Sequence, residues 1–134
     1  MKIGLDTSVI LRLLTGEPEE QAKCALDEAQ ALIQQGSVLL VSDLVVSEVY
    51  FALQHHYGMP KSEALKLLAQ FLGDSAIQSI GAAEAVLAVP NLATAKPGFI
   101  DRMIHAEYEI SGQEMLSFEK AAGRLSGVRV LTVG

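Results

Sequence analysis

Short apolar runs alternate along this chain with longer segments of helical periodicity. The runs lie at residues 3–5, 38–41, 115–118 and 128–132, with a weaker one at 76–80. Unbroken apolar strands are typical of parallel sheets with both faces covered, whereas a half-exposed sheet alternates apolar and polar residues. We therefore predict an α/β fold of three layers, with a central parallel sheet of about five strands covered by helices on both faces.

Helical patterns fill the intervals between these runs. Gly16 and Gly36 are expected to end the first two helices, and Ser42 can cap the third. Further helices are predicted over residues 61–72, 82–89, 99–110 and 119–125, with a loop at 90–98. The second helix, from residue 17 to residue 36, is expected to bury one apolar face, formed by Ala22, Ala25, Leu26, Ala29, Leu32 and Ile33.

The length and the cysteine content bound the class of protein. A chain of 134 residues without an internal linker or repeat predicts a single domain over residues 1–134. No apolar run is long enough to span a bilayer, and Asp6 interrupts the start before a signal-like stretch can form. The one cysteine, Cys24, has no partner, which fits a reducing compartment. We expect a cytoplasmic protein with no membrane association.

The charge balance restricts how the chain can bind nucleic acid. Ten Lys and Arg residues stand against sixteen Asp and Glu residues, a net charge of −6, and the basic residues are scattered. Proteins that coat nucleic acid by bulk electrostatics are basic, so this class is disfavoured. An acidic protein can still handle phosphates when a divalent cation lies between its carboxylates and the substrate.

Four acidic residues stand where such a cation can be held. Asp6 and Glu119 directly follow predicted strands, and Asp101 lies in the first turn of a helix. Glu48 shares a helix face with apolar residues, where an unpaired carboxylate would be desolvated. Each has an ordinary alternative: helix capping or a favourable dipole interaction for the first three, and a solvated or Lys-paired position at the edge of the apolar face for Glu48.

The arrangement of the four acids is more informative than any one of them. The carboxyl ends of parallel strands meet at one edge of a sheet, where ligands bind. Two carboxylates about 5 Å apart repel by about 3 kcal/mol at an effective dielectric near 20, so a cation is expected to offset them. Oxygen ligands without a histidine or cysteine cluster favour Mg²⁺ or Mn²⁺ over zinc.

Four motifs then resemble a known family. Ile3-Gly4-Leu5-Asp6-Thr7-Ser8, Ser47-Glu48-Val49, Gly98-Phe99-Ile100-Asp101 and Ser117-Phe118-Glu119-Lys120-Ala121-Ala122 are similar, in order and spacing, to the PIN-domain family, and most of all to VapC-type toxins of toxin–antitoxin pairs. The resemblance implies an Mg²⁺- or Mn²⁺-dependent endoribonuclease that forms a homodimer and is inhibited by a small cognate antitoxin.

The same resemblance implies roles for individual residues. Asp6 and Asp101 would coordinate metal, Glu48 would coordinate metal or orient the attacking water, and Ser8 would support a ligand or the phosphate. Glu119 stands where the family usually has Asp; with its extra methylene it would hold a water bound to the metal, or it marks weakened catalysis. Four basic residues near these acids can steer phosphates, although each is more simply understood as a solvated charge: Arg12, Arg102, Lys120 and Arg124.

Other functional classes stay open. A PIN-like binding module that has lost its cleavage activity would bind an antitoxin or RNA without turnover. The Glu at position 119, in place of the family's usual Asp, would then indicate the lost activity. A haloacid-dehalogenase-like phosphatase needs a second acid two residues after Asp6, where Ser8 stands, and a receiver domain needs paired acids near the first strand. His105, one turn after Asp101, is interpreted as a helix-surface histidine rather than as part of the site.

Overall fold

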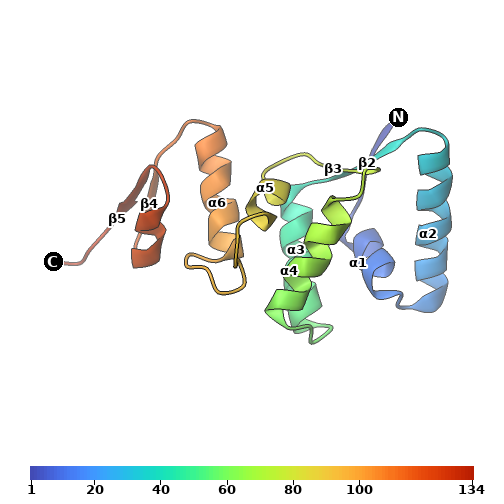
Figure 1. Cartoon of the computed structure of the whole chain (residues 1–134), viewed down its shortest axis with the longest axis horizontal. Helices are drawn as coiled ribbons and strands as arrows, with labels where there is room; N and C mark the ends of the chain where they lie inside the picture. Colours follow the sequence, from blue (N-terminus) through green and yellow to red (C-terminus); the bar gives the residue numbers. More distant parts are fainter.

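Five short parallel strands are divided between two sheets in the computed structural model, which describes residues 1–134 (Figure 1). The first sheet has the order β1-β2-β3, formed by Lys2–Gly4, Val38–Val41 and Ile77–Ser79. The second pairs β4 (Met115–Ser117) with β5 (Val128–Val130). The predicted α/β class is confirmed. The strands expected in one central sheet instead form a sheet of three and a sheet of two.

Each predicted helix forms close to its expected bounds. The helices are α1 (Thr7–Thr15), α2 (Glu19–Gln34), α3 (Asp43–His55), α4 (Lys61–Leu72), α5 (Ala83–Leu87), α6 (Phe99–Ile110) and the 3₁₀ helix η1 (Lys120–Arg124). Gly16 ends α1 with a φ of 73°, which favours glycine. Ser42 caps α3, because its hydroxyl accepts a hydrogen bond of 3.2 Å from the Val45 backbone N–H.

Helix α3 is at the centre of the main core. Val46, Val49 and Leu53 on this helix are almost fully buried and pack against α4, α1 and α6. Tyr50 of α3 meets Phe99 of α6 edge to face, with the ring centroids 4.9 Å apart. Burial raises the pKa of the Tyr50 phenol, since desolvation disfavours its charged form. The first half of α6 is therefore fixed in the core.

Helix α2 is the main departure from the sequence prediction. Of the six residues expected to bury its apolar face, only Ala29 is buried, while Leu26 and Ile33 are 48% and 40% exposed. The reason is that α2 lies at one end of the molecule, with only α1 and the start of β2 beside it (Figure 1). An apolar cavity of about 530 Å³ separates α2 from β1.

The C-terminal unit, defined here as β4, η1 and β5 (residues 115–130), lies at the opposite end of the molecule from α2 (Figure 1). Its strands pair with each other and with no strand of the first sheet. Leu116 and Phe118 are 61% and 69% exposed on this unit. No helix of the protein combines the length and the apolarity needed to cross a membrane.

Candidate metal and nucleic-acid site

Asp6 and Glu48 come together at the carboxyl end of β1. Asp6 caps α1, and its Oδ1 accepts a hydrogen bond of 2.8 Å from the Thr7 backbone N–H. The Thr7 hydroxyl in turn donates to Glu48 Oε1 at 3.0 Å. Thr7 therefore links the two carboxylates through its backbone and its side chain. Sequence reasoning did not assign a role to Thr7.

The environment of Glu48 differs from the sequence expectation. Glu48 is exposed, and so are its neighbours Leu44 (73%) and Phe51 (59%), because α3 buries a different face. The expected desolvation of this carboxylate is therefore wrong. Glu48, Thr7 and Phe51 line an open hollow of about 490 Å³, which places the carboxylate where a solvated ligand can reach it.

Asp101 and Glu119 lie in the other half of the chain. Asp101 is exposed in the first turn of α6, and Glu119 is exposed at the start of η1, where its backbone N–H donates to Ser117 Oγ at 2.9 Å. None of the four candidate acids forms an ion pair. No basic side chain of the protein therefore neutralises any of these four carboxylates.

A metal ion fits the donor chemistry of these acids but not their spacing within one chain. Carboxylate oxygens are the ligands that Mg²⁺ and Mn²⁺ prefer. Yet no three His, Cys, Asp or Glu side chains lie close enough to hold one ion. The structure brings Asp6 and Glu48 together through Thr7 and leaves Asp101 and Glu119 outside such a cluster.

Three of the four basic residues considered as phosphate contacts already bind backbone or side-chain oxygens. Arg12 Nε donates to Gln21 Oε1 at 2.6 Å, Arg102 Nε to the Pro97 carbonyl at 2.7 Å, and an Arg124 guanidinium N–H to the Lys96 carbonyl at 3.1 Å. Lys120 is exposed and forms no ion pair. Ser8 directly follows Thr7 in α1, is exposed, and lines the cavity beside α2.

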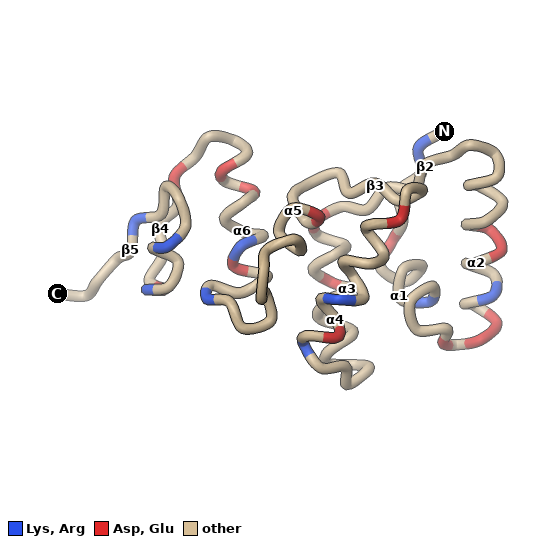
Figure 2. The backbone as a smooth tube through the Cα atoms, in the orientation of Figure 1, with Lys and Arg blue, Asp and Glu red and all other residues tan.

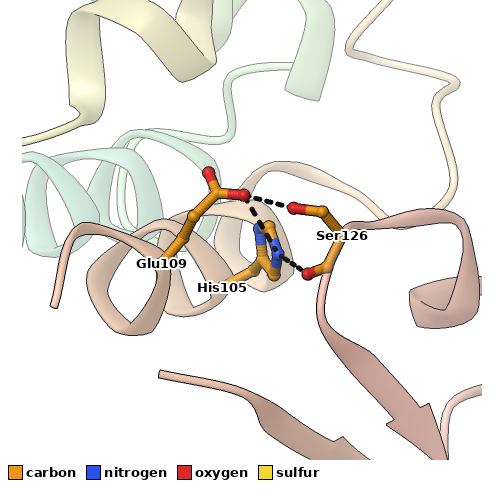
Figure 3. Close-up of polar contacts among 3 residues, drawn as sticks. All are labelled: His105, Glu109 and Ser126. Carbon is orange, nitrogen blue, oxygen red and sulfur yellow. Dashed lines mark hydrogen bonds and ion pairs between the residues drawn. The ribbon is translucent and has the colours of Figure 1, made fainter. Parts of the chain in front are cut away.

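His105 is buried, not on the helix surface as the sequence suggested. Its Nε2 donates to the Ser126 carbonyl at 2.7 Å and lies 3.9 Å from a Glu109 carboxylate oxygen, which also accepts from the Ser126 hydroxyl (Figure 3). The imidazole therefore joins α6 to the C-terminal unit. The spacing of four between His105 and Glu109 was the signal for this pair, because such residues are neighbours on a helix.

Asp43 is a second structural residue that sequence reasoning missed. Its carboxylate accepts hydrogen bonds from the backbone N–H groups of Ala82 and Ala83, at 2.9 and 3.0 Å. This contact fixes the start of α5 against α3. Residues 43 and 82 are far apart along the chain, so no local pattern indicates the contact.

Comparison with known families assigns the chain. A family model of the PIN domain matches residues 3–127, whereas no curated protein matches the chain. Proteins with this domain are generally nucleases, commonly dependent on divalent metal ions. The match covers almost all of the sequence and includes every candidate site residue, and the chain belongs to the PIN domain family.

Proposed function

We propose that this protein is a metal-dependent endoribonuclease, the toxin of a VapBC-type toxin–antitoxin pair. Three observations support the proposal. The chain belongs to a family of nucleases, its candidate ligands are all carboxylates, and none of these carboxylates is neutralised by an ion pair. The pairing of Asp6 with Glu48 through Thr7 carries the proposal furthest, because it joins two of the four motifs that are separated in the sequence.

The proposed ligands are Asp6, Glu48 and Asp101, with Glu119 as a more distant contributor and Ser8 in support. Divalent ions assist phosphodiester hydrolysis by activating water and by neutralising charge on the phosphate. Within a single chain, no three of these acids lie close enough together to share an ion. The substrate is proposed to be single-stranded RNA, whose bases and backbone are accessible.

The partners follow from the same proposal. The chain is expected to form a homodimer and to bind a small antitoxin in the cytoplasm. Residues 1–134 are proposed to act as one domain. Arg12, Arg102 and Lys120 are proposed phosphate contacts; each retains further N–H groups after the hydrogen bonds described above.

A second candidate is a binding module that pairs with an antitoxin or RNA and does not cleave. One observation favours it: no three candidate ligands lie within reach of a common ion. Glu119, longer by one methylene than the Asp usual in the family, is consistent with this candidate. The two functions differ in whether RNA is cut when metal is supplied.

RNA cleavage with Mn²⁺ or Mg²⁺ tests the proposal. We expect the wild-type chain to cut total RNA, chelator to stop cleavage, and Asp6→Asn to reduce the rate at least about 100-fold, because a direct ligand is lost. Asp27→Asn is the matched control, since Asp27 is an exposed acid paired with Lys23 and should leave the rate unchanged.

Each other outcome has a definite meaning. Equal cleavage by wild type and Asp6→Asn indicates a contaminating nuclease. No cleavage by wild type at any metal concentration overturns the nuclease and favours the binding module. Glu119→Asp adds a comparison: a large gain in rate shows that the native glutamate weakens catalysis.

A further inference from the structure

Both sheets end in an unpaired parallel strand. β1 pairs with β2 on one side only, and β4 pairs with β5 on one side only. A sheet edge exposes a row of free backbone N–H and C=O groups and is a template for another strand. Parallel sheets are normally covered, and a two-stranded sheet is marginal by itself. The free edge of β1 can therefore accept another parallel strand, and β4 has a free edge that can supply one.

The side chains of the two edges match in one register. With Gly4 opposite Ser117, Ile3 lies opposite Leu116, and Leu5 lies opposite Phe118. Residues directly opposite each other in a sheet project from the same face, and a shift by one residue would reverse the faces. Ile3 and Leu5 line the apolar cavity beside α2, so this register directs the exposed Leu116 and Phe118 toward it.

The cavity is suited to these two side chains. It measures about 530 Å³, and most of its exposed lining is apolar. Helix α2 contributes Ala25, Ala29 and Leu32, together with Gln21, Cys24 and Glu28. Leu26 and Ile33 on the same helix remain partly exposed. Filling the cavity with Leu116 and Phe118 would cover apolar surface on both partners, which is favourable in water.

Charge complements this fit. Helix α2 carries four acidic residues and one lysine, whereas the C-terminal unit carries three basic residues and one glutamate (Figure 2). Opposite potentials on facing surfaces steer association and fix its orientation. The acidic end of the molecule therefore attracts the basic end.

The chain's own C-terminal unit is held away from its own β1. His105 and Arg124 tie this unit to α6 and to the loop that precedes it, and Phe99 anchors α6 in the main core. Figure 1 places α6, α5, α3 and α4 between the C-terminal unit and α2. Closing within one chain would require one of these packed contacts to break. Docking on a second copy requires no such change.

We propose that two copies of this chain pair reciprocally, with β4 of each copy added in parallel to β1 of the other. Each contact buries Leu116 and Phe118 of one copy in the cavity beside α2 of its partner. Two such contacts related by a two-fold axis close the dimer and leave neither edge free. The sheet formed on each side has the order β3-β2-β1-β4-β5, with β4 and β5 from the partner.

This pairing has a consequence for the candidate site. Asp6 lies two residues after β1, and Glu119 lies two residues after β4. Neighbouring strands are about 4.8 Å apart, so the register that aligns Gly4 with Ser117 sets Glu119 of one copy beside Asp6 of the other. A site incomplete in one chain then gains a carboxylate from its partner. Only this consequence rests on the proposed function; the strand pairing does not.

A disulfide across the two strands tests the pairing. Gly4→Cys and Ser117→Cys are introduced together in a Cys24→Ser background, so that no native thiol competes. A Cβ at Gly4 meets nothing within 4 Å, so the substitution is accommodated. Adjacent strands have the Cα separation that a disulfide requires. On a denaturing gel, we expect mild oxidation to give a covalent dimer that reductant returns to the monomer.

The matched control is Lys2→Cys with Ser117→Cys, which shifts one thiol by two residues on the same strand face. Its Cα atoms would be about 8 Å apart, beyond the reach of a disulfide, so little dimer should form. Equal dimer from both pairs indicates random collision and overturns the register.

Three other results also overturn the proposal. A monomer whose thiols disappear on oxidation shows that β4 closes on β1 within one chain. A monomer that keeps both thiols shows that the edges stay unpaired. A ladder of higher multimers in dilute protein replaces the closed dimer with an open chain of copies. None of these readouts depends on nuclease activity, so failure of the pairing and failure of the proposed function are distinguishable.

Discussion

Asp43 is a residue whose short side chain organises two helices. Its carboxylate occupies the space beside Gly81 and accepts hydrogen bonds from Ala82 and Ala83. A Cβ added at Gly81 would come closer to this carboxylate than van der Waals contact allows. Glycine is needed at position 81 because of this close approach, not because of its backbone angles.

Gly81→Ala is therefore expected to destabilise the protein by about 1–3 kcal/mol, because the methyl group displaces Asp43 and breaks its two hydrogen bonds. Urea unfolding measures this change. Gly98→Ala is the control, since its added Cβ would lie 3.9 Å from the nearest atom, and we expect it to cost less than about 0.5 kcal/mol. Similar losses in both variants would contradict the role of Asp43.

At the level of single residues, the sequence predicted local roles such as helix capping better than it predicted burial. It indicated the capping positions of Asp6 and Ser42, because caps depend on the next few residues alone. It misjudged the burial of Glu48 and His105, because burial depends on which distant element covers a helix face. The site assignments of Asp6, Glu48, Asp101 and Glu119 all stay predictions.

Among the elements, α6 connects the two halves of the molecule. Phe99 and Met103 near its start are buried in the main core, and His105 further along holds the C-terminal unit through Ser126 (Figure 3). The strands of that unit are only three residues long each. Its attachment to α6 therefore contributes much of its order in an isolated chain.

His105→Ala is expected to loosen this unit. Removing the imidazole leaves the Ser126 carbonyl without its side-chain donor, a loss of about 1–3 kcal/mol. Hydrogen exchange in residues 115–130 of dilute protein should accelerate about tenfold or more, while exchange in α3 and α4 stays unchanged. His56→Ala, at an exposed histidine, serves as the control. Equal acceleration in α3 would indicate general unfolding instead.

The elements themselves were largely predictable, whereas the pairing of the strands was not. Strand and helix positions follow from local periodicity, and all five strands and every helix lie near their expected positions. Which strand lies beside β1 depends on contacts between distant segments, and the apolar runs at 3–5 and 115–118 do not encode it. The open face of α2 has the same cause, because its amphipathic pattern does not show what packs against it.

Over the whole molecule, α2 and the C-terminal unit are at opposite ends, with opposite charge and complementary apolar surface (Figure 2). The proposed reciprocal dimer joins these ends. Its stability should depend on Leu116, which is exposed in one chain and buried in the dimer.

Leu116→Lys is expected to raise the dimer dissociation constant at least about tenfold, because a charged group would enter an apolar cavity. Sedimentation over a range of concentrations measures this change. Ile80→Lys is the control: Ile80 is 57% exposed and follows β3, at the other edge of the three-stranded sheet. If both variants weaken the dimer equally, β1 is not the contact.

Two unpaired edges on one elongated chain also determine how the protein behaves as its concentration rises. Once one contact has formed, the second can close a ring of two copies, or a third copy can add and begin a filament. Dilution favours the ring, because closure is then intramolecular and further encounters are rare. Expression to a high concentration favours the filament. Slower expression should therefore give a higher yield of protein that is not in filaments.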